Sequence, residues 1–157
     1  MQIHILTIGN KMPAWVTEGY NEYARRMPRE CQLNLIELPP AQRSKTTDLK
    51  KALSDEGQRL LKAVPKNADI IVLDVKGRQH STETLSESLQ DWLASGRDIA
   101  LLIGGADGLS QDCINAATGK WSLSQLTFPH PLVRVVLAEQ LYRAWSLLNN
   151  HPYHRAG

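Results

Sequence analysis

A chain of 157 residues is long enough for one domain with its own hydrophobic core. Hydrophobic residues make up 42% of it and charged residues 22%, which excludes a disordered chain and is typical of a soluble globular protein. The net charge of +2 is too small by itself to indicate a nucleic-acid partner.

The first half of the chain alternates between strand and helix patterns. Short β-branched, apolar runs predict buried strands over residues 3–9 and 32–38. Residues 13–27 are predicted to form a helix, because a proline suits its first turn and the arginines near its end suit a helix C-terminus. After the loop 39–46, Thr46 or Thr47 is expected to cap a helix with one apolar face.

Basic residues gather around the first predicted helix and the following loop. Residues 1–66 hold 11 Lys and Arg against 7 Asp and Glu. Phosphate contact needs such a local patch rather than a large total charge, although an ordinary solvated surface explains the same charges. The candidate cations are Arg25, Arg26, Arg29, Arg43, Lys45, Lys50 and Lys51.

The second half continues the alternation. Strands are predicted over 69–74, 98–104 and 121–128, with a helix between Ser81 and Gly96. A short helix is expected at about 110–118 and a long one over 132–150. Five strand–helix alternations predict a single α/β domain over residues 1–157, with a mainly parallel sheet of about five to six strands and helices on both faces.

The last predicted helix is apolar around most of its circumference, so it must be covered on two sides. A neighbouring helix of the same chain or a second subunit could cover it, and we expect a homodimer. Its apolar residues are Leu132, Val133, Val136, Leu137, Leu141, Tyr142, Ala144, Trp145 and Leu148.

The cysteines and apolar runs bear on the compartment. Cys31 and Cys113 lie far apart without a CxxC spacing, which predicts buried free thiols in a reducing compartment. No apolar run approaches the roughly 20 residues of a membrane span, and the first residues form a strand pattern rather than a signal peptide. We expect a cytoplasmic protein without a membrane partner.

The stretch "LLIGGADGLS" (101–110) ends a strand in a glycine loop. It lacks the lysine of a phosphate-binding P-loop, and it follows the fourth strand rather than the first, unlike a dinucleotide fingerprint. S-adenosyl-L-methionine fits, because glycines allow close approach to its nucleoside and Asp107 is compatible with its cationic sulfonium. A tight turn with Ser110 as a helix cap is the structural alternative.

The chain end carries several polar side chains. His130-Pro131 stands directly before the last predicted helix and His151-Pro152 directly after it. The tail then adds Tyr153, His154 and Arg155, which is unusual for a terminus unless it docks. His130 and His151 could equally be helix-end residues without a catalytic role.

Three stretches resemble the ribosomal large subunit pseudouridine methyltransferase H family, a SPOUT-class or α/β-knot group. They are "IGNKMPAWVTEGYNEYARRMP", "LLIGGADGLS" and "WSLSQLTFPHPLVRVVLAEQLYRAWSLLNNHPYHR", and the similarity runs from about Ile3 to Arg155. The resemblance implies methylation of N3 of a pseudouridine in 23S ribosomal RNA on the assembled ribosome, with no DNA partner. This chain has Ala106-Asp107 where the family usually has Pro-Glu, and Ala156-Gly157 follow the usual terminal arginine.

The resemblance also implies a C-terminal trefoil knot with S-adenosyl-L-methionine in its crevice. The implied cofactor-binding residues are Leu73, Gly104, Leu123, Ser124, Gln125, Leu126, Thr127 and Phe128. For Leu73 and Leu126, an ordinary place in the core is the alternative.

Methyl transfer to N3 requires that the nitrogen lose its proton, for which His130, His154 and Asp107 are candidates. Arg155 could stabilise negative charge or grip a phosphate, and Tyr153 could contact the base. The expected catalytic residues are His154, Arg155, Tyr153 and His130. No metal site is predicted, because no Cys or carboxylate neighbours the His151/His154 pair. The alternative function is a non-catalytic nucleotide-sensing or RNA-binding α/β module.

Overall fold

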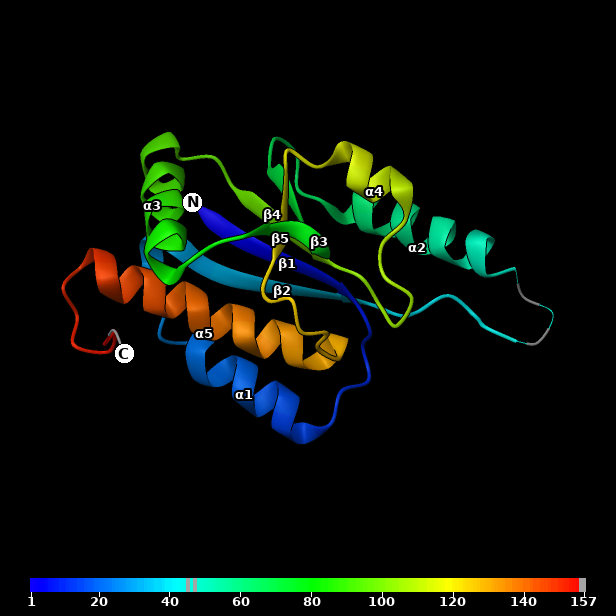
Figure 1. Cartoon of the computed structure of the whole chain (residues 1–157), viewed down its shortest axis with the longest axis horizontal. Coiled ribbons are helices and arrows are strands. Elements are labelled where there is room, and N and C mark those ends of the chain that lie inside the picture. Colours follow the sequence, from blue (N-terminus) through cyan, green and yellow to red (C-terminus); the bar gives the residue numbers. More distant parts are fainter. Residues whose placement is uncertain (45, 47, 156–157) are drawn as a thin grey trace.

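The computed structural model describes residues 1–155 apart from 45 and 47, and its centre is a five-stranded sheet (Figure 1). The strands are β1 (Gln2–Ile8), β2 (Gln32–Leu38), β3 (Asp69–Gln79), β4 (Ile99–Ile103) and β5 (Gly119–Ser122). Their order in the sheet is β2-β1-β4-β3-β5, and every neighbouring pair is parallel. The predicted parallel sheet is confirmed.

Five α-helices cover the two faces of the sheet, as predicted (Figure 1). Helices α1, α3 and α5 lie on one face, and α2 and α4 lie together on the other. A single 3₁₀ turn precedes β2. The α-helices are α1 (Ala14–Ala24), α2 (Leu49–Ala63), α3 (Thr82–Ser95), α4 (Gln111–Ala116) and α5 (His130–Leu148).

Each face of the sheet has its own hydrophobic cluster. Ile5 of β1 packs on the α1–α3–α5 side, whereas Leu6 packs on the α2–α4 side, because successive residues of a strand point to opposite faces. Strand β4 is buried along its whole length. Cys31 and Cys113 are free and buried, as expected, and burial raises the pKa of the Cys31 thiol to about 11.

Local capping chemistry sets several helix ends. The Ser81 hydroxyl accepts from the amide of Thr84 at 3.0 Å, and Gly96 ends α3 with a left-handed φ of 73°, both as predicted. Helix α2 differs from the prediction. Its cap is Asp48, whose carboxylate accepts from the amide of Lys50; Thr46 precedes this cap, and Thr47 lies outside the described residues. A carboxylate also suits the positive helix end.

Two boundaries near the C-terminus differ from the prediction. The last strand ends at Ser122 rather than residue 128, because the chain leaves the edge of β3 there and residues 123–128 make no ladder bonds among the described residues. Helix α5 begins at His130 rather than Leu132, because Pro131 is compatible with a first helical turn, where its missing N–H has no partner to lose.

Helix α5 lies between α1 and α3 and contacts both, on one face of the sheet (Figure 1). Leu137, Leu141 and Ala144 are fully buried there. The apolar circumference of α5 is therefore explained largely within one chain, and it does not by itself require a second subunit.

A buried arginine connects α5 to the sheet. The Arg134 side chain is almost inaccessible; its Nη1 donates to Glu37 Oε2 at 2.6 Å and its Nη2 donates to the Gly9 carbonyl at 3.1 Å. These bonds join the first turns of α5 to the ends of β1 and β2.

We expect Arg134→Leu to lower the free energy of unfolding by about 3 kcal/mol, because it strands a carboxylate and a carbonyl that were paired. Urea unfolding at fixed protein concentration measures the change. Arg97→Leu is the matched control, since its ion pair with Asp69 is exposed and should contribute less than about 1 kcal/mol. Equal losses in both variants would contradict a special role for the buried pair.

Candidate active site

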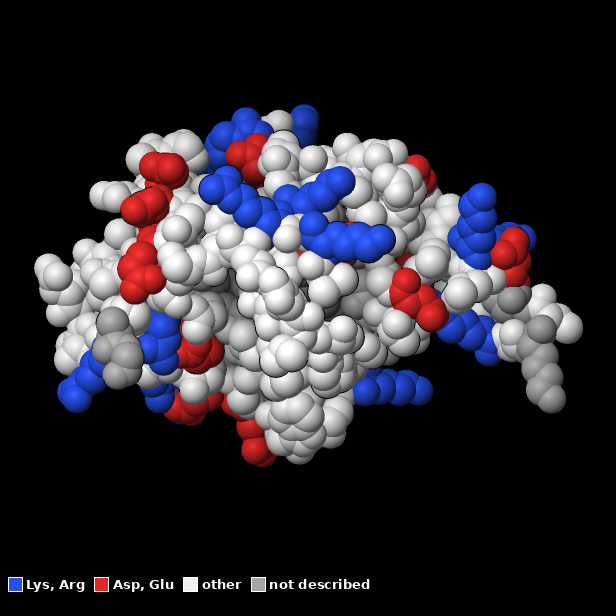
Figure 2. Space-filling model, in the orientation of Figure 1, with Lys and Arg blue, Asp and Glu red and all other residues white. Residues whose placement is uncertain are grey.

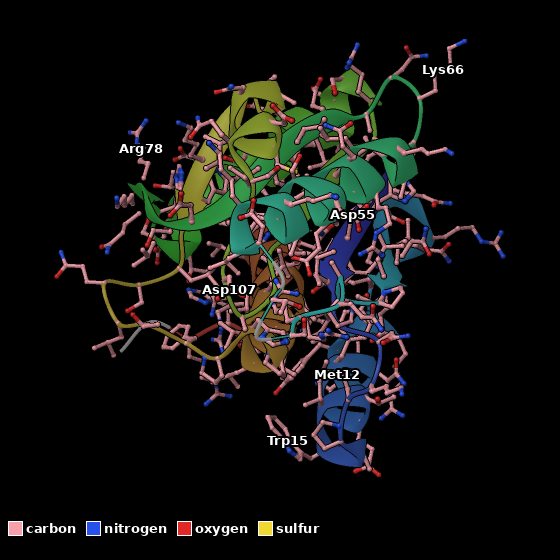
Figure 3. The ribbon with its side chains drawn as sticks, turned by 90° about the vertical axis from the view of Figure 1, so that its right-hand side faces the viewer. Met12, Trp15, Asp55, Lys66, Arg78 and Asp107 are labelled. Carbon is pink, nitrogen blue, oxygen red and sulfur yellow. The ribbon has the colours of Figure 1, made fainter. Side chains whose placement is uncertain are left out.

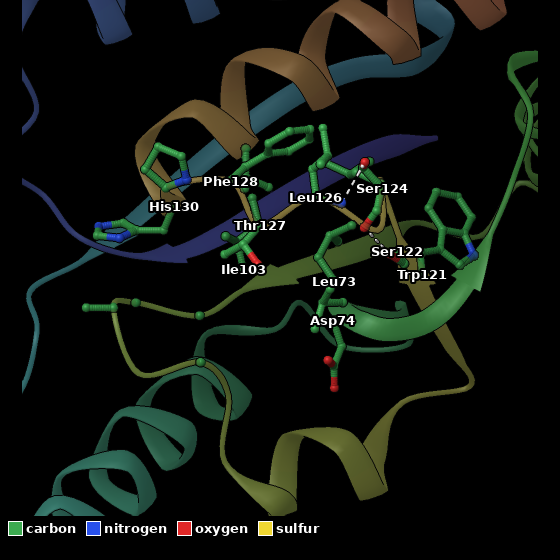
Figure 4. A pocket seen from close by; sticks show the side chains of 18 residues that line it. Leu73, Asp74, Ile103, Trp121, Ser122, Ser124, Leu126, Thr127, Phe128 and His130 are labelled. Atoms are coloured by element: carbon green, nitrogen blue, oxygen red, sulfur yellow. Dashed lines mark hydrogen bonds between the residues drawn. The ribbon is translucent and has the colours of Figure 1, made fainter.

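A cavity of about 470 Å³ opens where the carboxyl ends of β3 and β4 meet the loop after β5 and the first turn of α5 (Figure 4). Ligands of parallel α/β sheets bind at this edge, and the volume is in the range of small-molecule sites. Seven of the eight implied cofactor residues line it; Gln125 does not. The seven are Leu73, Gly104, Leu123, Ser124, Leu126, Thr127 and Phe128.

The glycine loop forms one wall as a tight turn. A Cβ on Gly104 would lie 2.4 Å from the carbonyl carbon and oxygen of Gly108, so only glycine fits there. Gly108 has a φ of 83°, and its amide donates to the Gly105 carbonyl at 3.1 Å. Ser110 caps α4. The loop therefore forms the predicted tight turn with its Ser110 cap and also lines the cavity.

Residues 123–128 form the opposite wall. The Ser122 hydroxyl donates to the Ser124 carbonyl at 2.9 Å, and the Ser124 hydroxyl accepts from the amide of Leu126 at 3.0 Å (Figure 4). Leu126 is 71% exposed, so its alternative place in the core is wrong. Leu73 is partly buried and packs on the larger cluster while also lining the cavity.

The cavity suits an uncharged nucleoside better than a phosphate. Its described lining residues include no Lys or Arg, and most are apolar. Asp74 is the acidic residue among those that line the cavity, and it lies at the rim below Leu73 in Figure 4. Asp74 is not among the residues predicted from the sequence, although its place directly after a buried stretch of strand was a usable signal. A carboxylate at this rim favours a cation nearby.

His130 lies at the α5 end of the cavity. Burial, with a further contribution from the positive charge of Arg134, lowers the pKa of His130 below its usual value. The ring packs near Gly9, where an added Cβ would come within 3.3 Å of Nε2. His130 is therefore neutral at neutral pH and can accept a proton.

The C-terminal tail docks on helices rather than lining the cavity. The Tyr153 hydroxyl donates to Glu139 Oε1 at 2.9 Å, and the Arg143 guanidinium lies 4.8 Å from the Tyr153 ring centre. His154 Nε2 is 3.8 Å from Glu83 Oε1, while Arg155 is exposed. Burial and Glu139 raise the pKa of Tyr153, so its hydroxyl stays protonated at neutral pH.

Within one chain, the tail and His130 do not come together. The tail folds back along α5, so that Tyr153 packs beside Glu139 and Arg143 in the middle of the helix, whereas His130 at its start lines the cavity. The catalytic set expected from the sequence is therefore not assembled in one cavity of a single chain.

Asp107, labelled in Figure 3, does not line the cavity, unlike its neighbours Ala106 and Gly108. Arg43 Nε donates to Asp107 Oδ2 at 2.8 Å, and Arg43 Nη1 donates at 2.7 Å to Glu56, whose side chain is buried. Because Arg43 holds it, Asp107 is a poor candidate for accepting a proton in the cavity.

The expected front-half basic patch is partly neutralised. Arg25 and Arg26 both pair with Glu22, and Arg43 pairs with Glu56 and Asp107. Lys45 lies outside the described residues. These arginines are occupied by carboxylates rather than free to bind phosphate.

A second cavity of about 460 Å³ adjoins the first and shares Trp121 to Ser124 and Phe128 with it. His80 stacks at a tilt on Trp121, with ring centres 5.1 Å apart, and Gln140 of α5 completes the far side. Burial and the charge of Arg78 lower the pKa of His80. Neither His80 nor Gln140 is among the residues predicted from the sequence.

Known proteins of similar sequence cover the whole chain. Three relatives named ribosomal RNA large subunit methyltransferase H come from Methylococcus capsulatus, Thioalkalivibrio sulfidiphilus and Hydrogenovibrio crunogenus. They are 60%, 57% and 55% identical to this chain, and the alignments cover 99% of it and 100%, 99% and 99% of the relatives.

The fold has a counterpart in a solved methylase family protein from Haemophilus influenzae Rd KW20, with a TM-score of 0.54 and 13% identity over 98% of this chain and 70% of that one. The trefoil knot implied by the resemblance stays an expectation from the family, because strand order does not record threading. No helix of the described residues is long and apolar enough to cross a membrane. Residues 1–154 match the family described as predicted SPOUT methyltransferase, and the chain belongs to this SPOUT methyltransferase family.

Proposed function

We propose that this methyltransferase uses S-adenosyl-L-methionine to methylate N3 of a pseudouridine in large-subunit (23S) ribosomal RNA, on the assembled ribosome. The observation that carries the proposal is the 60% identity, over full length, to a relative named as a large-subunit ribosomal RNA methyltransferase. Because this substrate is ribosomal RNA, we propose that the protein acts in the cytoplasm. The domain is one unit over residues 1–157.

The first cavity is the proposed cofactor site, and its chemistry fits the donor. The apolar side chains of Leu73 and Phe128 can pack against the faces of an adenine. The turn at Gly104 allows the main chain to approach a sugar closely. Gln125, which does not line the cavity, is proposed to contribute only main chain at its edge. When bound, the sulfonium supplies an electrophilic methyl group, which suits the nearby carboxylate of Asp74.

His130 is the proposed proton acceptor. N3 of the base forms its bond to the methyl carbon as the carbon–sulfur bond breaks, and the N3 proton moves to the neutral imidazole. The lowered pKa of His130 keeps it unprotonated for this step. Most of the remaining acceleration comes from holding nitrogen, methyl and sulfur in line.

The tail residues are proposed to act on the cavity of a second subunit. Tyr153, His154 and Arg155 do not line the cavity of their own chain, and Tyr153 is held beside Glu139 and Arg143 on α5. In a homodimer, the partner's tail would supply a cation for the base oxygen or a phosphate and a ring for stacking.

Methylation itself is tested with ribosomes from a strain that lacks this activity. Purified protein, labelled S-adenosyl-L-methionine and 70S ribosomes, 50S subunits or free 23S RNA are incubated, and the RNA is digested and mapped by mass. Transfer to one pseudouridine is expected. Ligand binding without transfer to any of the three substrates would favour a non-catalytic RNA-binding module instead.

A mixing experiment tests the shared site. His130→Gln and Arg155→Ala are each expected to be nearly inactive, whereas their co-expression should restore about a quarter of wild-type activity, because half the dimers carry one intact site. Differently tagged chains allow the mixed dimer to be purified and assayed. Activity no greater than that of the two parents would place the whole site within one chain.

A further inference from the structure

We propose that three cations on β3 and β5 form a phosphate-binding surface that docks the RNA substrate beside the cofactor cavity. This surface, here called the β3–β5 basic surface, consists of Lys76, Arg78 and Lys120. The inference rests on the proposed function, because it assigns the part of this chain that holds the RNA.

Backbone packing brings the three residues together. A Cβ on Gly77 would lie 2.7 Å from the carbonyl carbons of Lys120 and Trp121, so β3 and β5 touch here at main-chain distance. Lys76 and Arg78 flank Gly77, and Arg78 pairs with Trp121 in the register. Because Trp121 directly follows Lys120, all three cations lie within this one stretch of strand pairing.

The charges of this surface are unmatched. Lys76, Arg78 and Lys120 are exposed and form no ion pair with any residue that the structure describes, whereas most arginines of the chain do. Figure 2 shows basic side chains gathered over β3 and β5 with acidic ones at the margins. Clustered positive charges repel one another, so binding of an anionic partner would reduce the electrostatic repulsion between them.

The surface borders the cofactor cavity. Asp74 and Val75, just before Lys76, line the cavity, as does Trp121, just after Lys120. Asp74 is the nearest acidic side chain in sequence, and its carboxylate accepts from the amide of Lys76 at 3.0 Å. Arg78 points outward from the end of β3 (Figure 3), and its charge already lowers the pKa of His80.

An RNA backbone is the occupant that fits this arrangement. The cations stand outside the cavity on an open surface, so they suit a ligand whose phosphates stay outside while one base enters. Long, flexible lysines act as point charges for phosphate rather than as a shaped pocket. The paired arginines of the front half cannot serve in the same way.

The test compares binding to 70S ribosomes and to protein-free 23S RNA across a salt series. The variant Lys76→Gln/Arg78→Gln/Lys120→Gln should weaken binding to both at least about tenfold, and should reduce the slope of log affinity against log salt by about 2 to 3. Calorimetry should give wild-type affinity for S-adenosyl-L-methionine, which verifies folding. Binding is measured directly, so the result stands even if no methyl transfer is found.

Two matched variants complete the test. Lys62→Gln/Lys66→Gln removes charge from exposed positions elsewhere and should change the affinity and salt slope much less per charge removed. The charge-preserving Lys76→Arg/Arg78→Lys/Lys120→Arg should bind nearly as the wild type. Equal losses in both neutralised variants, or an unchanged salt slope, would overturn the proposal. Loss on ribosomes but not on free RNA would assign the surface to a ribosomal protein instead.

Discussion

Replacing His130 with Gln should lower kcat by about 100-fold or more, with affinity for S-adenosyl-L-methionine changed little. Gln fills similar space at the end of the cavity but cannot accept the N3 proton. Because burial lowers the pKa of His130, the acid limb of the wild-type rate should have its midpoint below pH 6.5.

Single-turnover methylation of ribosomes from pH 5.5 to 8.5 measures both effects, and calorimetry reports cofactor binding. His151→Gln is the matched control, because His151 is exposed at the other end of α5 and should leave the acid limb unchanged. A His130→Gln enzyme with near wild-type kcat, or with the same acid limb, would remove His130 as the proton acceptor.

Replacing Gly104 with Ala should lower affinity for S-adenosyl-L-methionine by about 100-fold. The new methyl group would lie 2.4 Å from main-chain atoms of Gly108, which cannot move aside as a flexible side chain could. The glycine loop must therefore shift, and it forms one wall of the cavity.

Calorimetry measures the affinity, and thermal unfolding without ligand separates a local shift from general loss of structure. Gly119→Ala is the control, because a Cβ there makes only ordinary contacts, the nearest at 3.6 Å to Ile71. Unchanged binding by Gly104→Ala, in a protein as stable as the wild type, would show that the cofactor does not use this wall.

Patterns within a few residues of each other were sufficient for most of the fold. The apolar strands, the Ser81 cap and the Gly96 terminus follow from local hydrogen bonding and side-chain periodicity, which the sequence records directly. The predictions that were wrong concern positions where several local signals compete. Asp48 is the observed cap of α2, and the run "WSLSQLTF" leaves the sheet after Ser122 because no strand partner continues beside it.

The sequence by itself determined the alternating α/β elements, the glycine turn and, through family resemblance, the residues that line the cavity. Only the tertiary structure decided that Asp107 is held by Arg43, that His130 lines the cavity while Tyr153 packs beside Glu139, and that Lys76 and Lys120 lie on adjacent strands. Capping and periodicity depend on neighbours within one or two turns. Ion pairs and shared surfaces depend on distances between segments that only packing brings together.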